Sequence, residues 1–371
     1  MTLSNAEYLI LKELFRDPIL PYNKLANLVG LSPPTVKKKI EGLLVKNIIK
    51  SFYGEYYPEA IGLESHMFLL SVQSVDKLRL VERIIDFFPY LVSRSRCYGS
   101  ISGIYVKVHL PLNSLNRFMF LLEYLSDANL IAEIIPSSTI GRGIKTHTDL
   151  TYWDQNTGNW TFGWHMWEKN IDMVDYVPQF DYFQKVSSEK PKNVLKHMHF
   201  HDFELLRELV SNPVQKHIIL AKKIGLRPYN FSRRVKFLNE YVIRKYMVDF
   251  DRSFFGLEDD FVFKAICSPR AMAKIIYLMH NLDLPFKSDF RNTERGFLWK
   301  ILLPPKDKLG LINILWSLFP DLQIMMRDPH EAAVKPFNPN NYSFMEQSWK
   351  DSEEYMVDQV LELARGEFIL A

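Results

Sequence analysis

The chain repeats itself, and this repeat limits the folds it can adopt more than any other feature. Residues 203–246 match residues 8–51 without a gap, so that Gly30 corresponds to Gly225, 195 residues later. At the same spacing Pro33 corresponds to Pro228 and Leu43 to Leu238. A second stretch, "GLESHMFLLSV" at 62–72, returns as "GLEDDFVFKAI" at 256–266. Two copies of one structural unit therefore follow each other in the sequence.

Each copy begins with a pattern of three short helices. In the first copy, apolar residues recur at helical spacing from Asn5 to Phe15, and "NKLANLV" ends on Gly30, as a helix C-terminus often does. Ser32 and Pro33 then suit the N-cap and first turn of a third helix. A glycine turn between the second and third helices predicts a helix-turn-helix. The β-branched and aromatic stretch "NIIKSFYGEYY" after it predicts a strand or wing.

The outward-facing residues of the third helices are the candidate DNA-binding residues. The third helix of the first copy is rich in lysine and has no acidic residue before Glu41, which suits an approach to phosphates. The alternative is that these lysines only form a solvated helix face. The third helix of the second copy carries asparagine and arginine, which can pair with adenine and guanine respectively. We expect both units to bind double-stranded DNA, at an asymmetric site. The candidates are Ser32, Pro34, Thr35, Lys37, Lys38, Lys39, Arg227, Tyr229, Asn230, Ser232, Arg233 and Arg234.

After each trihelical unit the order strand, helix, strand, strand, helix, strand predicts a ferredoxin-like domain. We therefore expect an α+β protein with two winged helix-turn-helix domains and two ferredoxin-like (βαββαβ) domains in tandem. The predicted boundaries are 1–58, 62–140, 196–252 and 256–330, with an aromatic-rich connector at 141–195 and an extension with an amphipathic helix at 331–371. The free sheet faces carry apolar residues, so they need cover, either within the chain as a pseudo-dimer or from a second chain in a homodimer.

At this point the sequence resembles the Lrp/AsnC family of bacterial and archaeal transcription regulators. The family pattern L-S-x-x-T-V-x-x-R-I-x-x-L-x-x-x-G-V-I is met by Leu31, Ser32, Thr35, Val36, Ile40, Leu43, Ile48 and Ile49, while Asn47 replaces the glycine. The resemblance implies a DNA-binding transcription regulator that pairs its ferredoxin-like sheets. It also implies a small-molecule effector, often an amino acid, near a G-x-x-D motif. Gly99 and Gly103 lie at that place here, without the aspartate.

The connector is the part for which the repeat offers no counterpart. Residues 151–195 carry four of the seven tryptophans, Trp153, Trp160, Trp164 and Trp167, so we expect an ordered strap, with partner docking or base stacking as the alternative. Only 184–193 has the composition of a solvated linker. Two cysteines, a net charge of +3, the lack of a signal-peptide pattern and short apolar runs predict a cytoplasmic protein that does not enter the membrane.

Motifs for catalysis are missing from the sequence. There is no P-loop, dinucleotide-binding glycine motif, G-x-S-x-G or H-E-x-x-H, and His197, His199 and His201 favour exposed histidines over a metal site. We therefore expect no cofactor, no metal and no enzymatic activity. Two alternatives remain open. One is a protein-binding or architectural paralogue without DNA binding. The other is an enzyme like the siroheme decarboxylases, which resemble Lrp/AsnC proteins; Arg94, Arg96 and His109 lie on the relevant strands.

Overall fold

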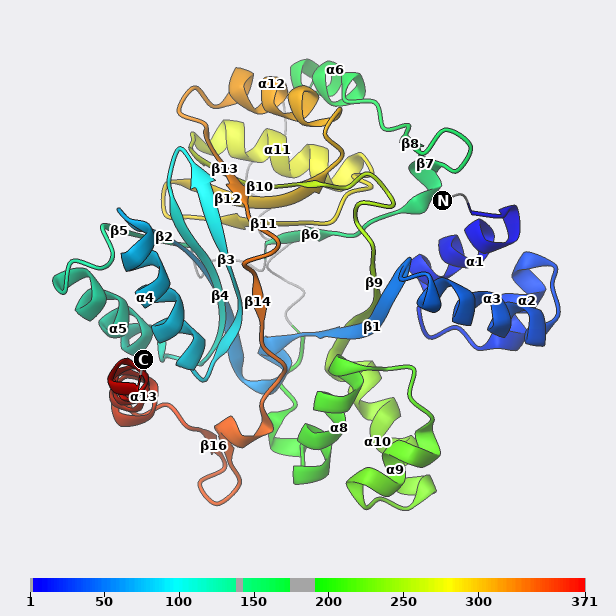
Figure 1. Cartoon of the computed structure of the whole chain (residues 1–371), viewed down its shortest axis with the longest axis horizontal. Helices are drawn as coiled ribbons and strands as arrows, with labels where there is room; N and C mark the ends of the chain where they lie inside the picture. The colour runs from blue at the N-terminus through cyan, green and yellow to red at the C-terminus, as the bar shows by residue number, and fades with distance from the viewer. Residues whose placement is uncertain (1–2, 138–142, 174–190, 371) are drawn as a thin grey trace.

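Two helix-turn-helix units form where the sequence predicts them. The computed structural model describes residues 3–137, 143–173 and 191–370. The first unit has α1 (Asn5–Arg16), α2 (Tyr22–Val29) and α3 (Pro33–Val45), and the second has α8 (Phe200–Ser211), α9 (His217–Ile224) and α10 (Pro228–Tyr241). Gly30 and Gly225 end the middle helices with φ of 67° and 77°, in the left-handed region that favours glycine. Figure 1 shows the two units side by side at the edge of the molecule.

The strands that follow the two third helices pair with each other. β1 (Ile49–Tyr56) and β9 (Ile243–Phe250) form a two-stranded antiparallel ribbon, with Tyr53 opposite Met247. The sequence predicted each strand but not its partner, which lies in the other copy. The ribbon therefore joins the two helix-turn-helix units to each other (Figure 1).

Both ferredoxin-like units have the predicted order of elements. The first contains β2 (Leu63–Ser71), α4 (Val75–Phe87), β3 (Leu91–Gly99), β4 (Gly103–Pro111), α5 (Leu115–Asp127) and β5 (Glu133–Pro136). The second contains β10 (Asp259–Ile266), α11 (Pro269–Asn281), β11 (Ser288–Asn292), β12 (Gly296–Leu303), α12 (Lys308–Leu318) and β13 (Gln323–Arg327). Their strand orders are β5-β2-β4-β3 and β13-β10-β12-β11, so each is a complete four-stranded antiparallel sheet. The predicted fold class is confirmed.

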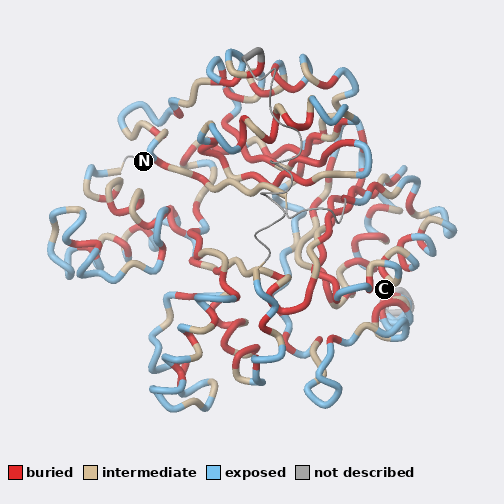
Figure 2. The backbone as a smooth tube through the Cα atoms, turned by 180° about the vertical axis from the view of Figure 1, so that it is seen from behind, coloured by how far each residue is buried: buried red, intermediate tan, exposed pale blue. Residues whose placement is uncertain are grey.

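The two sheets associate within the chain. β3 pairs with β13, with Tyr98 opposite Met326, which makes one continuous sheet. A separate apolar cluster combines residues from both units: Met67, Leu69, Cys97, Ile101, Tyr105, Ile135, Val262, Leu298 and Met325. The chain thus forms an intrachain pseudo-dimer, and Figure 2 shows buried residues concentrated on the strands and inner helix faces. Pairing between two chains stays a prediction.

Each ferredoxin-like unit is followed by an extension that crosses to the other copy. After the first come β6 (Ile144–Thr146), β7 (Trp153–Asp154), β8 (Asn159–Trp160) and α6 (His165–Met173); after the second come β14 (Ala333–Val334), β15 (Tyr342–Ser343), β16 (Ser348–Trp349), a π-helical turn η5 (Glu354–Asp358) and α13 (Gln359–Leu370). β6 pairs with β11 and β14 with β3. α6 packs on α11 and α12, and α13 packs on α4. Short 3-10 turns are η1 (Pro58–Ile61), η2 (Leu150–Tyr152), η3 (Leu195–His197) and η4 (Pro339–Asn341).

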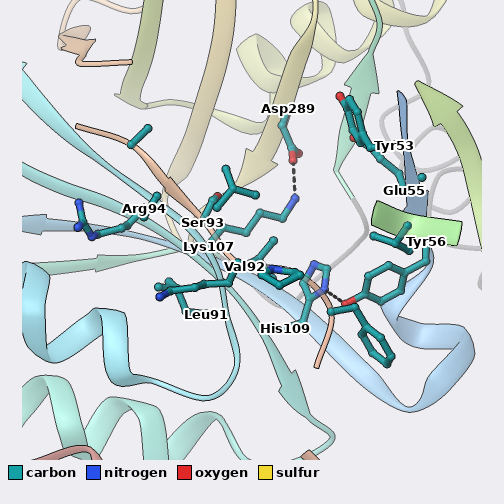
Figure 3. A pocket seen from close by; sticks show the side chains of 18 of the residues that line it. Tyr53, Glu55, Tyr56, Leu91, Val92, Ser93, Arg94, Lys107, His109 and Asp289 are labelled. Atoms are coloured by element: carbon teal, nitrogen blue, oxygen red, sulfur yellow. Dashed lines mark hydrogen bonds and ion pairs between the residues drawn. The ribbon is translucent and has the colours of Figure 1, made fainter. Parts of the chain in front are cut away.

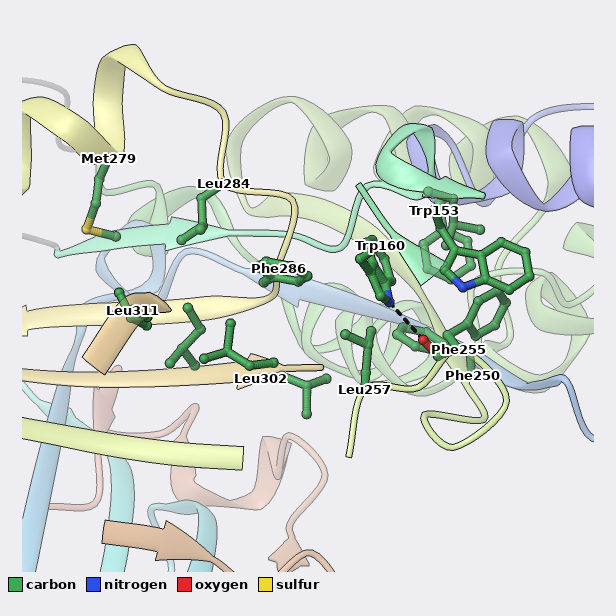
Figure 4. Packing of buried hydrophobic residues seen from close by; sticks show 14 of the residues in the cluster. Trp153, Trp160, Phe250, Phe255, Leu257, Met279, Leu284, Phe286, Leu302 and Leu311 are labelled. Atoms are coloured by element: carbon green, nitrogen blue, oxygen red, sulfur yellow. Dashed lines mark hydrogen bonds between the residues drawn. The ribbon is translucent and has the colours of Figure 1, made fainter. Parts of the chain in front are cut away.

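The expectation that the connector has no counterpart in the repeat is wrong. The indole N–H of Trp160 donates to the Phe255 carbonyl at 2.8 Å, and that of Trp349 donates to the Ile61 carbonyl at 2.8 Å. Phe255 and Ile61 each precede the repeated glycine of "GLE", so these two bonds are equivalent. Figure 4 shows Trp153 and Trp160 packed near Phe255, as an ordered strap requires. The predicted linker 184–193 lies, up to residue 190, outside the described residues.

Candidate ligand cavity at the centre of the chain

A cavity of about 630 Å³ lies between the ribbon and the two ferredoxin-like units. Residues 51 and 53–56 of β1 form one wall, β3 and β4 a second, and residues 145–147 and 287–289 a third (Figure 3). The end of α8 and residues 332–338 also contribute. Both copies therefore build one site, of a volume usual for small-molecule and cofactor pockets.

Positive charge dominates this cavity. Eight cationic side chains line it, against three carboxylates, and two histidines are present as well. The cations are Arg94, Lys107, Lys145, Arg252, Lys287, Lys300, Arg327 and Lys335; the carboxylates are Glu55, Asp249 and Asp289; the histidines are His109 and His147. Ion pairs with carboxylates already hold Arg94, Lys107, Lys145, Arg252 and Arg327, whereas Lys287, Lys300 and Lys335 are in no ion pair with the described residues. The cavity is therefore suited to a ligand with several carboxylates or phosphates.

Two polar contacts hold the ribbon to the rim of the second sheet. Lys145 Nζ lies 3.1 Å from Glu55 Oε2, and Lys287 Nζ donates to the Tyr53 hydroxyl at 2.6 Å. Burial alone raises the pKa of Glu55, but the nearby Lys145 and Lys287 ammonium groups outweigh it and hold this pKa well below its usual value. Glu55 is therefore ionised at neutral pH.

The lysines at equivalent places on β4 and β12 have lowered pKa values. Burial, followed by the repulsion of Lys145, lowers the pKa of Lys107 to about 8, although its Nζ lies 3.2 Å from Asp289. Burial, followed by the repulsion of Arg327, lowers the pKa of Lys300 to about 7. Among the described residues Lys300 has no hydrogen-bond or ion-pair partner. Its ammonium form is therefore unfavourable until an anion enters.

A tyrosine and a histidine form the main proton-bearing pair. The Tyr56 hydroxyl lies 2.8 Å from His109 Nδ1, and the two rings meet edge to face (Figure 3). Burial and the charge of Lys107 hold the pKa of His109 well below its usual value, so the ring is neutral near pH 7. In the tautomer in which Tyr56 donates to Nδ1, the ring proton lies on Nε2. Burial also lowers the pKa of His147 to about 4, and its buried Nδ1 has no partner among the described residues.

The three residues of the decarboxylase-like alternative, Arg94, Arg96 and His109, have different surroundings in the structure. His109 lies in the cavity, whereas Arg94 reaches it only at the edge, because its guanidinium is paired with Asp86 and Glu82 at 2.6 and 2.9 Å. Arg96 is paired with Glu82 at 2.8 Å. The two arginines thus mainly fix β3 to α4.

Gly99 and Gly103 lie where another backbone approaches closely. A Cβ on Gly99 would meet the Ile324 carbonyl oxygen at 2.4 Å, and one on Gly103 would meet the Leu70 carbonyl oxygen at 1.9 Å. Both glycines therefore permit close strand packing, and an effector site near them stays a prediction.

The candidate DNA-binding residues divide into two groups. Three of them have structural contacts: Ser32 caps α3 by accepting from the Thr35 amide, Ser232 donates to the Pro228 carbonyl, and Arg234 pairs with buried Asp202 while stacking on Phe237. Lys39 is partly covered and contacts Ser4. The others are exposed, although Lys37 lies 3.8 Å from Glu41: Pro34, Thr35, Lys37, Lys38, Arg227, Tyr229, Asn230 and Arg233.

Sequence reasoning missed most of the cavity. One signal was available, because "GIYVKVHLP" and "GFLWKILLP" each place a lysine in the middle of an apolar strand, at Lys107 and Lys300. A lysine kept at the same buried place in both copies indicates a role other than solvation.

The fold and site define a class: two winged helix-turn-helix units and two ferredoxin-like units fused around one basic cavity. A family model described as winged helix-turn-helix DNA-binding matches residues 3–50. Comparison with curated proteins found no match. The solved structure of the siroheme decarboxylase NirDL is similar, with 12% identity and a TM-score of 0.56, and the match covers 97% of this chain and 100% of that one.

A second NirDL structure, in co-complex with an iron-uroporphyrin III analogue, matches with 14% identity and a TM-score of 0.54, covering 97% of this chain and 99% of that one. E. coli AsnC matches with 18% identity over 39% of this chain and 99% of its own, with a TM-score of 0.31. The family model confirms the winged helix-turn-helix that the resemblance predicted for the start of the chain. The prediction that the chain is not an enzyme is wrong, since the solved structures that match 97% of it are those of an enzyme. Among the described residues, no helix is long and apolar enough to cross a membrane.

Proposed function

We propose that the chain binds a polycarboxylate tetrapyrrole of the siroheme class in its central cavity and decarboxylates it. The observation that carries this proposal is the excess of cationic side chains around one buried space of about 630 Å³. The NirDL structures add support at the level of the fold. A tetrapyrrole with several acidic side chains matches both the charge and the size class of the cavity.

The residues present suit a decarboxylation without an oxidant. A side-chain acetate loses CO₂ when its C–C bond breaks, the electron pair stays on the methylene carbon and the ring, and a proton then converts that carbon to a methyl group. Lys107 and Lys300 would bind carboxylates that are not removed. His109 is the candidate proton donor through Nε2, and Tyr56 would pass its hydroxyl proton to Nδ1 in the same step, so that the ring stays neutral and water then reprotonates Tyr56.

The test combines binding and turnover. Adding iron uroporphyrin III to the full chain should shift its Soret band, and siroheme should give products that have lost CO₂, detected by mass spectrometry. Lys300→Met should weaken the binding of iron uroporphyrin III by at least about tenfold, because one charge-assisted contact is lost. Lys169→Met is the matched control, since Lys169 is exposed on α6. Unchanged affinity in Lys300→Met, or siroheme recovered intact, would contradict the proposal.

DNA binding, as in a transcription regulator, is the second candidate function. It is supported by the family match over residues 3–50 and by the exposed side chains on the first turns of α3 and α10. Duplex DNA should bind the full chain with a steep salt dependence, and changing Lys37 and Lys38 to alanine should weaken this binding on all sequences. Binding that is unaltered by these changes would refute a role for α3.

A further inference from the structure

The amine of Lys300 is held less firmly than the other cations of the cavity. Its counterpart Lys107 on β4 lies 3.2 Å from Asp289, whereas Lys300, although opposite Asp289 in the register of β11 and β12, is in no ion pair or hydrogen bond with the described residues. Lys287 donates to a tyrosine hydroxyl, and Lys335 is exposed. Lys300 therefore presents a half-buried amine with no partner to the cavity.

Much of this amine is uncharged at neutral pH. Burial, followed by the repulsion of Arg327, lowers the pKa of Lys300 to about 7. Lys287 and Arg252 act in the same direction, while Asp260 opposes them but is itself paired with Arg327 at 2.7 Å. At about pH 7.5 roughly three quarters of the chains carry a free amine at Lys300, against roughly one in a thousand for an exposed lysine. A free lysine amine is a nucleophile.

Carbon dioxide is the electrophile that such an amine meets in this cavity, because the proposed reaction releases CO₂ there. The Nζ atom of Lys300 attacks the carbon of CO₂, one C=O electron pair moves onto an oxygen atom, and the nitrogen loses a proton to water. The product is a carbamate, and the step consumes neither an oxidant nor a reductant. The positive charges of Arg327, Lys287 and Arg252, which disfavour an ammonium group at Lys300, stabilise this anion.

We propose that Lys300 accepts CO₂ as a carbamate and that this modification weakens the binding of the polycarboxylate ligand, so that a product of the reaction inhibits it. The inference rests on the proposed function for the ligand and for the source of CO₂. The carbamate replaces a positive charge that faces the ligand with a negative one. A bound ligand carboxylate, in turn, keeps Lys300 protonated and unreactive. Ligand binding and carbamate formation therefore oppose each other.

Carbon-13 NMR of the empty full chain tests the site of modification. In labelled bicarbonate at about pH 7.5, the unaltered chain should give a carbamate resonance that is absent from Lys300→Met, while the carbamate of the N-terminal amine remains in both. Lys169→Met is the matched control and should keep every resonance, since Lys169 is exposed on α6. Alkylation with triethyloxonium and peptide mass spectrometry should place the carbamate on Lys300, and iron uroporphyrin III should prevent its formation.

Soret titration tests the effect on binding. Iron uroporphyrin III is added to the full chain in bicarbonate and, separately, in formate at the same concentration, since formate is an anion of similar size that forms no carbamate. Because only unmodified chains bind with full affinity, the apparent Kd should rise in bicarbonate by the reciprocal of the unmodified fraction that NMR measures, about twofold if half the chains are modified. Lys300→Arg keeps the charge without a reactive amine, and its Kd should be the same in both salts.

The outcomes separate this inference from the function beneath it. If the unaltered chain and Lys300→Met give the same carbamate resonances, the inference is overturned and the proposed function stands. If the carbamate forms but the Kd is the same in bicarbonate and formate, inhibition by CO₂ is rejected. If iron uroporphyrin III does not bind in either salt, the proposed function fails, while a resonance that depends on Lys300 would still support the modification site.

Discussion

Replacing Lys300 should stabilise the empty protein while it weakens ligand binding. Lys300 is half-buried on β12, and no carboxylate among the described residues is within ion-pair distance of its amine. Methionine has a similar length and no charge, so Lys300→Met removes the unfavourable burial of an ammonium group without leaving a large void. A residue that binds a ligand charge is expected to reduce stability in this way.

The size of the stabilisation by Lys300→Met and its dependence on pH follow from the pKa of Lys300. Burial lowers the pKa of Lys300 from 10.5 to about 7. Since one pKa unit corresponds to about 1.4 kcal/mol, the charged amine destabilises the folded chain by about 5 kcal/mol below pH 7. Between pH 7 and 10.5 the unfolded chain binds more protons than the folded chain, so the stability of the unaltered protein rises with pH and the penalty shrinks. At about pH 9 roughly 2 kcal/mol should remain.

Urea denaturation at about pH 6 and about pH 9 measures this effect. The stability gain of Lys300→Met over the unaltered chain should be larger at the lower pH, by roughly 3 kcal/mol. Comparing the two proteins at each pH cancels the groups that they share. Lys169→Met, exposed on α6, should show no gain at either pH. An equal gain at both pH values, or a loss of stability at about pH 6, would refute the argument that Lys300 carries a buried and unpaired charge.

Three further changes test other contacts. Tyr56→Phe removes the donor to His109 Nδ1 and should slow siroheme decarboxylation by roughly ten- to a hundredfold with an altered pH profile, followed by mass spectrometry; a plain loss of folded protein in circular dichroism would contradict a proton-positioning role. The double change of Lys37 and Lys38 to alanine should lower the slope of log affinity for DNA against log salt by about two, and an unaltered slope would exclude phosphate contacts there. Trp349→Phe loses the bond to the Ile61 carbonyl and should destabilise the chain by about 1–3 kcal/mol in urea; no change would mean that this extension adds nothing.

Local features of the fold were predictable because each depends on neighbours in the sequence. Ser32, Pro33 and Gly30 mark helix ends by their own backbone and capping preferences, and the structure has these ends as expected. The βαββαβ order followed from apolar periodicity in the same way. The pairing of β1 with β9 could not be predicted so directly, because Tyr53 and Met247 are far apart in the sequence and nothing local selects the partner.

The cavity was less predictable than the fold for a related reason. Lys107 and Lys145 come from different elements of the first copy, and Lys287 and Lys300 from the second, so no short motif contains them. Of the residues that line the cavity, only Arg94 and His109 were singled out, and both came from a family resemblance. The repeat of the extension could not be recognised in the sequence, because the residues around Trp160 and Trp349 differ. The two tryptophans are related only by their equivalent hydrogen bonds to the Phe255 and Ile61 carbonyls. A site whose residues come from strands far apart in the sequence can be recognised only when the arrangement of those strands is known.

Duplication within one chain explains why the cavity has equivalent lysines on β4 and β12 but a histidine on β4 alone. β4 and β12 begin at Gly103 and Gly296, so Lys107 corresponds to Lys300 and His109 to Leu302. A homodimer would have to place every such residue twice around one shared cavity. In a fused chain the second copy can keep the lysine, which adds charge to the common space, and use Leu302 for apolar packing, where a second buried imidazole would need its own partner. The cations of both halves can then act on one ligand, while proton transfer at His109 acts from one side alone.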